Sequence, residues 1–247
     1  DIIEYYVGGL RYIGHEATKD EINDMKASLG VKEAGKNYNI MVDGRGTGLS
    51  PPTEKQWDSL EGDFILDSVE DTDLTASEYD ISQQAYFPEI RSQGSQGSCS
   101  AWAVSYYSYG YLEAKDRGWS EAISGNEDQL MSPAWTYNKV NGGTDEGSSL
   151  LGCGNLVRDW GSSTWAEMPY DDSDAVSWGD DHAFREAPSH RADSVHHISY
   201  SGDETVDAVK NLIASDTPVT FAMDASAYNL TDNYVMSSVE YDGGTPN

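Results

Sequence analysis

The sequence predicts an α+β fold, because helical patterns come first in its main part and a buried strand pattern follows them. Residues 99–115 form a largely apolar run that ends close to a glycine, as a buried helix does. Residues 149–160 and 204–214 each place aliphatic side chains on one helical face. Residues 217–223 (TPVTFAM) are typical of a buried strand.

The first fifty residues predict a small β-α-β module. A strand pattern over residues 5–13 is followed by a helical pattern over residues 18–30, which begins with a capping box and ends at a glycine. A second strand is expected at residues 37–43. We therefore expect residues 1–50 to form a unit of their own.

A break in composition follows this module. Residues 44–52 contain three glycines and two prolines, which makes them the best candidate for a domain boundary. From Asp58 to Asp80 the chain carries nine acidic residues and no basic one. We expect residues 51–84 to be an acidic connector packed on the main domain, which spans residues 85–247.

The charge of the chain limits its partners. Its 247 residues include 43 acidic and 15 basic ones, which leaves a formal net charge of −28. Such a charge opposes binding to nucleic acid or to an anionic lipid surface, and no apolar run reaches the roughly 18 residues that a membrane span needs. A glycosylation sequon at Asn229 fits a secreted or cell-surface protein.

The most informative segment is a glycine-rich turn that leads directly into a helix, residues 93–103 (QGSQGSCSAWA). It places Cys99 in the first helical turn, where unpaired N–H groups and the helix dipole favour a thiolate and lower the thiol pKa. The backbone amide of Cys99 and the side-chain amide of Gln93 are suited to stabilise an oxyanion in acyl transfer. The sequence contains one other cysteine, Cys153, and a bridge between the two stays open.

This segment resembles the papain-like cysteine peptidase family, in which a glutamine six residues before the nucleophile donates to the oxyanion. Gln93 and Cys99 have that spacing. The glycine-serine-cysteine run without a second upstream cysteine resembles the divergent prokaryotic or archaeal branch, although Ser100 stands where most members carry tryptophan. The resemblance covers roughly Asp73 to the end, and it implies a two-lobed fold with a helical lobe, a strand-rich lobe and a cleft between them.

The resemblance also implies a substrate-binding cleft. Gly147 and Ser148 would contact the backbone of an extended peptide, Leu150 would face the main specificity pocket, and Ala222 would lie deeper in that pocket. Cys153 would lie on the inner face of the next helix and be inert. Residues 1–50 would be either an inhibitory pro-segment or an accessory domain.

A papain-like enzyme also needs a histidine that activates the cysteine and an asparagine that orients the histidine. The resemblance places both after the helix at residues 204–214. The histidines of the chain all precede that point: His15, His182, His190, His196 and His197. We therefore expect the catalytic pair just beyond Asn247, in a continuation of the polypeptide or in a second chain, and residues 85–247 to be incomplete at their C-terminus.

The resemblance implies no metal or organic cofactor. One acidic cluster has oxygen atoms suited to a hard cation, but its spacing matches no calcium loop, so a solvated acidic turn is the preferred interpretation. The cluster comprises Asp171, Asp172, Asp174, Asp180 and Asp181.

The resulting hypothesis is an endopeptidase that cleaves peptide or protein substrates through an acyl-enzyme on Cys99. Its acidic surface would attract substrates with basic side chains. One alternative is a cell-surface or assembly-forming protein that kept the fold and lost catalysis. Another is a different thiol acyl-transferase, such as a transglutaminase-like crosslinker, which would not be expected to show the spacing of Gln93.

Overall fold

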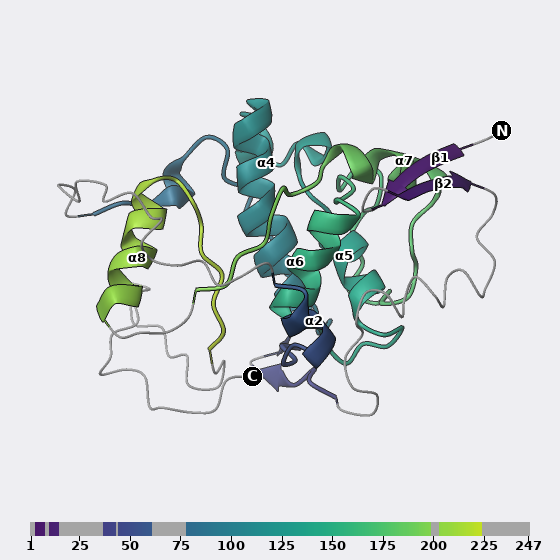
Figure 1. Cartoon of the computed structure of the whole chain (residues 1–247), viewed down its shortest axis with the longest axis horizontal. Coiled ribbons are helices and arrows are strands. Elements are labelled where there is room, and N and C mark those ends of the chain that lie inside the picture. The colour runs from purple at the N-terminus through teal and green to yellow at the C-terminus, as the bar shows by residue number, and fades with distance from the viewer. Residues whose placement is uncertain are drawn as a thin grey trace.

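The computed structural model describes residues 3–7, 10–14, 37–42, 44–60, 78–198 and 203–223. Figure 1 shows that helices dominate this part of the chain. The longer helices are α2 (Glu54–Asp58), α4 (Gly110–Arg117), α5 (Pro133–Val140), α6 (Leu150–Asp159), α7 (Asp181–Glu186) and α8 (Asp203–Ala214). Short helical turns are η2 (Ile81–Gln83), α3 (Cys99–Ala101), η4 (Ala122–Ser124), η5 (Glu127–Gln129) and η6 (Ala187–Ser189). The strands are β1 (Ile3–Val7), β2 (Leu10–Gly14), β3 (Met41–Val42) and β4 (Arg45–Gly46).

The central element is one long helical run that begins at the candidate nucleophile. It passes from α3 through the π-helix η3 (Trp102–Tyr109) into α4, and it ends at Gly118, whose φ of 70° provides the left-handed cap that glycine adopts readily. The helix predicted over residues 99–115 is thus confirmed. A π-helical stretch is rare and is frequently found at functional sites.

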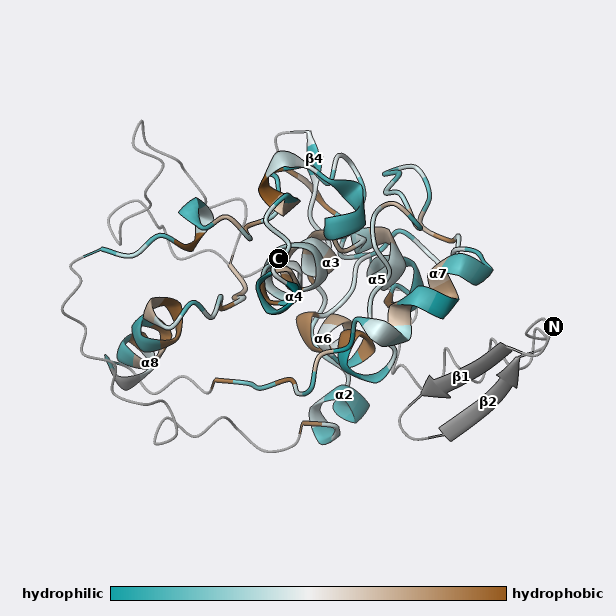
Figure 2. Ribbon diagram, turned by 90° about the horizontal axis from the view of Figure 1, so that it is seen from above, coloured by the Kyte–Doolittle hydropathy of each residue, from teal (hydrophilic) through white to brown (hydrophobic). Residues whose placement is uncertain are grey.

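The other two predicted helices are also confirmed. The helix at residues 149–160 is α6, and its N-cap Ser149 accepts a hydrogen bond from the backbone of Gly152. The helix at residues 204–214 is α8. Figures 1 and 2 show α8 set apart from the group formed by α4, α5 and α6.

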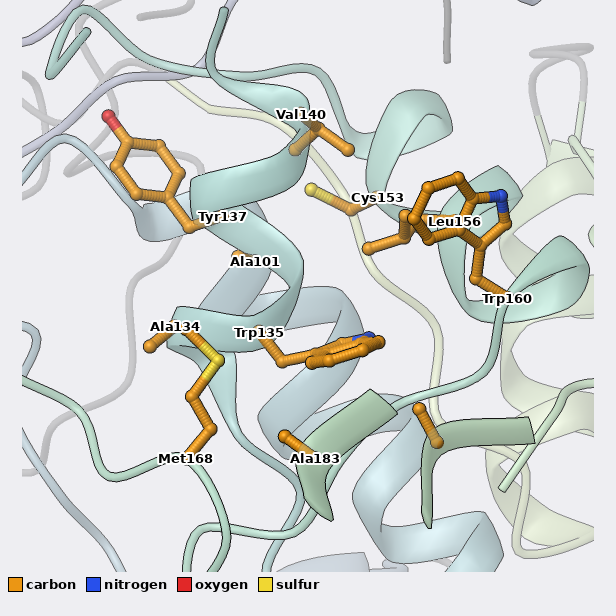
Figure 3. Packing of buried hydrophobic residues seen from close by; sticks show 11 residues of the cluster. Ala101, Ala134, Trp135, Tyr137, Val140, Cys153, Leu156, Trp160, Met168 and Ala183 are labelled. Carbon is orange, nitrogen blue, oxygen red and sulfur yellow. The ribbon is translucent and has the colours of Figure 1, made fainter. Parts of the chain in front are cut away.

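The core lies where α5 packs against α3 and α6. Trp135 is 1% exposed, and Figure 3 shows its ring beneath Leu156 and Cys153 in a layer of apolar side chains. The helix begins sharply because the Ser132 hydroxyl accepts from the backbone of Trp135 and donates to the carbonyl of Met168. The buried members of this cluster are Ala101, Ala134, Trp135, Tyr137, Val140, Cys153, Leu156, Trp160, Met168, Ala183 and Ala187.

An aromatic cluster fixes the segment before residue 171 against the helix that carries the candidate nucleophile. The ring centroid of Trp102 lies 5.0 Å from that of Tyr170 and 5.9 Å from that of Trp165, both edge-on. Edge-to-face pairs at such distances stabilise packing beyond simple burial. The guanidinium of Arg91 lies over the Trp165 ring at 4.4 Å.

The N-terminal prediction needs correction. Residues 5–13 are not one strand, because β1 and β2 pair as an antiparallel hairpin in which Val7 faces Leu10. The sequence between them is Gly-Gly, a two-residue hairpin signal that outweighs the continuous apolar pattern. The helix expected at residues 18–30 lies outside the described residues. The strand expected at residues 37–43 is the two-residue β3, which pairs with β4 and not with the first hairpin, so the described residues do not show the β-α-β module.

The prediction for the C-terminal half is wrong in the described residues. Residues 217–223 follow α8 without strand structure, and Phe221 is 71% exposed. A strand pattern forms a strand only where a neighbouring strand offers a ladder, and the described part of the chain offers none here. The strand-rich lobe is therefore not observed, and residues 224–247 lie outside the description.

Within the described ranges, every helix is too short or too polar to cross a membrane.

Candidate active site

Cys99 is the first residue of α3 and is partly exposed at the end of the glycine-rich turn. Gly94 in that turn has a φ of 62°, and a side chain there would collide with the carboxylate of Asp172. That carboxylate instead accepts hydrogen bonds from the backbone (2.9 Å) and hydroxyl (3.1 Å) of Ser95. The shape of the turn therefore depends on Gly94 and on the side chain of Asp172, which lies 77 residues after Ser95 in the sequence.

A tyrosine also holds the turn close to Cys99. The Tyr170 hydroxyl donates to the carbonyl of Gln93 at 2.8 Å and lies 2.7 Å from the hydroxyl of Ser98. The two ends of the turn are thus tied to one side chain. Tyr170 belongs to the aromatic cluster, so packing of that cluster also positions the candidate nucleophile.

Both expected oxyanion donors are directed at peptide carbonyl groups. The side-chain amide of Gln93 donates to the carbonyl of Gly46 at 2.8 Å and to that of Gln96 at 3.0 Å. The backbone N–H of Cys99 points to the carbonyl of Thr47 with a longer separation of 3.5 Å. The segment around Gly46 and Thr47 therefore occupies the expected oxyanion donors.

The same segment pairs with the expected substrate-binding strand. The backbone N–H of Ser148 donates to the carbonyl of Gly48 at 2.8 Å, and the N–H of Ser50 donates to the carbonyl of Ser148 at 2.9 Å. This forms a parallel bridge between Leu49 and Ser148. Residues 37–42 and 44–50, called the docked segment below, thus lie between the nucleophile turn and residues 146–148.

Glycines allow the backbones to approach this closely. A Cβ atom on Gly46 or Gly48 would lie under 3.0 Å from backbone atoms of the nucleophile turn, and one on Gly147 would lie equally close to the backbone of Gly48. The two sides meet main chain to main chain. The buried hydroxyl of Ser100, the residue that departs from the family pattern, donates to the carbonyl of Ser148 at 2.7 Å and ties that strand to α3.

The electrostatics of Cys99 differ from the expectation of an activated thiolate. Burial raises the pKa of the Cys99 thiol, and hydrogen bonds with Ser100 offset this effect only in part. In this arrangement the cost of desolvation thus exceeds the benefit of these hydrogen bonds. Cys153 is fully buried, and burial raises the pKa of its thiol to about 12. Both cysteines are free thiols.

None of the histidine contacts found in the described part of the chain reaches Cys99. His190 is 5% exposed and bonds through Nδ1 to the Glu113 carboxylate at 2.6 Å. The Nε2 of His196 lies 2.8 Å from the Ser194 hydroxyl, and the ring of His197 packs on Trp57. His15 lies outside the described residues.

The two expected pocket residues, Leu150 and Ala222, lie in different surroundings. Leu150 is the first residue of α6 and is partly exposed close to Ser148. Ala222 is exposed in the segment after α8, where the described residues form no strand ladder, so its expected place deep in a pocket is not observed there and stays a prediction.

Two residues that the sequence interpretation missed are Tyr137 and Asp145. One oxygen of the Asp145 carboxylate accepts hydrogen bonds from the Tyr137 hydroxyl and from the backbone of Gly97, both at 2.8 Å. In the sequence, the one indication of a role for Asp145 is its position immediately before the expected substrate-binding strand.

The acidic cluster stabilises turns. Asp171 accepts from the backbone of Ser173, Asp174 accepts from two backbone amides of its own loop, and Asp180 caps α7. In the described residues no group of three acidic, histidine or cysteine side chains is placed to hold a metal ion.

A hollow of about 190 Å³ beside this loop is lined by residues that include Ala134, Met168, Glu167, Asp171 and Asp180, and not by Cys99.

Comparisons with known proteins find only distant likenesses, all of them among solved structures. No known protein family and no curated protein matches the sequence. Among solved structures, the chain is similar to xylellain, a cysteine protease from Xylella fastidiosa, with a TM-score of 0.45 and 16% sequence identity. The match covers 75% of this chain and 65% of xylellain, so the chain spans about two thirds of the length of that protein. At this TM-score the likeness is too distant to assign a fold or an activity.

Proposed function

We propose that the chain is part of a papain-like cysteine endopeptidase in which Cys99 is the nucleophile. One observation carries the proposal: the amides of Gln93 and Cys99 both face carbonyl oxygens of an extended peptide segment. A site that receives peptide carbonyls through two amide donors is suited to stabilise the oxyanion of acyl transfer. The adjacent strand at Ser148 supplies the backbone pairing that extended peptides use.

The proposed reaction uses this arrangement in two steps. The Cys99 thiolate attacks the carbonyl carbon of the substrate, a C–S bond forms, and the charge on oxygen is stabilised by Gln93 and the Cys99 amide. The amine leaves with a proton, and water then hydrolyses the thioester to a carboxylate. Proton transfer requires a histidine oriented by an asparagine, and we propose that a C-terminal continuation or a second chain supplies them. The chemistry needs no metal or organic cofactor.

The docked segment is bound as a ligand and not as a substrate. The two donors of the site bond to two different carbonyl groups, those of Gly46 and Thr47, so no single carbonyl carbon is polarised by both. The segment must leave before a substrate peptide binds. Gly147, Ser148 and Leu150 are then proposed to contact the substrate backbone and its side chains.

The test is peptide hydrolysis by the natural polypeptide. We expect Cys99→Ser to abolish cleavage of a fluorogenic peptide with basic side chains, and Gln93→Ala to lower kcat by roughly 10²–10³-fold, the range for loss of one oxyanion donor. Cys153→Ser is the matched control and should leave the rate unchanged. Cleavage that survives Cys99→Ser would overturn the proposal.

A second candidate is a secreted or cell-surface protein of the same fold that binds partners without catalysis. It is favoured by the burial of the Cys99 thiol, which raises its pKa and opposes formation of the thiolate. An epoxide probe for activated cysteines, mapped by mass spectrometry at mildly acidic pH, separates the two candidates. Selective modification of Cys99 in the natural polypeptide supports the peptidase, and an unmodified Cys99 after removal of the docked segment supports the binding protein.

A further inference from the structure

The carboxylate of Asp145 lies where three segments of the chain meet. Its Oδ1 atom accepts hydrogen bonds from the backbone of Gly97 and from the hydroxyl of Tyr137, both at 2.8 Å. Its Oδ2 atom accepts from the side-chain amide of Asn39 in the docked segment at 2.9 Å. One side chain therefore links the nucleophile turn, α5 and the docked segment.

We propose that Asp145 is a positioning residue with two separate tasks, an inference that rests on the proposed function. Through Oδ1 it holds the turn that presents Cys99, and through Oδ2 it clamps the docked segment over the site by its bond to Asn39. The clamp opens when the segment leaves, while the bond to Gly97 keeps the turn in place.

The surroundings of the first task favour a permanent bond. Gly97 is buried two residues before Cys99, and hydrogen bonds to an ionised carboxylate are about twice as strong as neutral ones. Burial and the hydrogen bond to Asp145 raise the pKa of Tyr137, so its hydroxyl remains a donor at any physiological pH. The Tyr137 hydroxyl also accepts a hydrogen bond from the backbone of Gly147 at 3.1 Å, so the bond between Asp145 and Tyr137 also helps to position the expected substrate-binding strand.

The surroundings of the second task favour a bond that breaks when the segment leaves. Asn39 reaches Asp145 only because residue 97 is glycine, since a Cβ there would lie 2.7 Å from the Cβ of Asn39. The same amide nitrogen of Asn39 makes a longer bond of 3.3 Å to the carbonyl of Ser95. Its Oδ1 atom is buried without a hydrogen-bond partner in the described structure. The attachment of this side chain to the site thus depends mainly on the Asp145 carboxylate.

A charge exchange between the two side chains tests the clamp. Asn39→Asp places a second carboxylate against Oδ2, and like charges at this distance repel. We expect the rate at which a bulky maleimide labels Cys99 to rise by roughly tenfold or more, because the reagent needs the segment to leave. The double variant Asn39→Asp, Asp145→Asn restores one donor and one acceptor at the same place, and labelling should return to near the wild-type rate.

Asn37→Asp is the matched control. It adds the same charge to an exposed side chain of the same segment, and a carboxylate at this position can still accept from the backbone of Asn39 as the asparagine does at 2.8 Å. We expect wild-type labelling from this variant. Cys153 should stay unlabelled throughout, which shows that each variant remains folded.

Two results would overturn the proposal. The first is a labelling rate for Asn39→Asp equal to that of Asn37→Asp, which would mean that the bond to Asp145 does not hold the segment. The second is a double variant that labels as fast as Asn39→Asp, which would mean that the paired bond is not the cause. Because labelling needs no peptidase activity, these failures are distinct from a failure of the proposed function, which peptide hydrolysis by Cys99→Ser would reveal.

Discussion

Gly48→Ala should release the docked segment by a predictable amount. The added Cβ would lie under 3.0 Å from the backbone of Gly97, and a backbone group cannot move aside as the end of a flexible side chain can. Overpacking of this kind costs about 1–3 kcal/mol. The φ of 111° at Gly48 adds a further strain, about 1–3 kcal/mol for a residue with a side chain.

Gly44→Ala separates the two contributions. Gly44 also has a positive φ, 76°, but a Cβ there would meet no atom within 4 Å. The difference between the two variants is therefore mainly the collision, about 1–3 kcal/mol. Since 1.4 kcal/mol corresponds to a factor of ten, Gly48→Ala should populate the released state about 5- to 150-fold more than Gly44→Ala.

The assay is the rate of maleimide labelling at Cys99, which is proportional to the released population when docking is fast compared with labelling. Limited proteolysis of the segment gives a second measure of the same population. Equal labelling rates for Gly48→Ala and Gly44→Ala would refute the reasoning, because the close approach of the two backbones would then contribute nothing to docking.

Two buried ionisable groups should make the stability of the fold depend on pH. Burial alone would raise the pKa of Glu113, but hydrogen bonds from His190, Arg117 and Tyr109 outweigh it and lower that pKa. This stabilisation is present above the ordinary carboxyl pKa and is lost as pH falls through the lowered value. Glu113→Gln should lower the free energy of unfolding, measured with urea at pH 7, by about 3 kcal/mol. The same variant should lose less of its stability than the wild type as the pH is lowered. Burial also holds the pKa of Lys139 well below its usual range, so stability should rise as pH increases from that lowered value towards about 10.4. Lys139→Met should remove this rise between pH 7 and 9, and an unchanged rise in the variant would assign it to another group.

The local elements of the fold were predictable because their signals are local. The apolar spacing of α6 and its serine cap lie within a dozen residues of sequence. The helix that begins at Cys99 is likewise indicated by the apolar run that follows two glycines. The pattern over residues 5–13 predicts one strand and not the first hairpin, because Gly8-Gly9 fits within a continuous apolar pattern. The strand predicted at residues 217–223 failed because its formation depends on a neighbouring strand, which no local pattern reports.

The docking of residues 37–50 was not predictable from local pattern. Gly46 and Gly48 were interpreted as a boundary between domains, since glycines in sequence indicate a break more often than a close contact. Their role appears only when the turn at residues 93–99 and the strand at residues 146–148 are brought to them from 50 to 100 residues away. The same holds for Asp145, whose three partners come from three separate segments.

The main-chain nature of this docking has a consequence for how the chain can evolve. Apart from the contacts of Asn39 and Gln93, the segment is held through backbone carbonyls, which every amino acid carries, and backbone amides, which only proline lacks. Exposed positions such as Ile40, Met41 and Arg45 can therefore change to residues other than proline without loss of this pairing. Selection would act instead on the positions where no side chain fits. Divergence at those exposed positions is therefore compatible with a segment that still docks, and a stretch of variable residues between a fixed Asn39 and fixed glycines would be its trace in related genes.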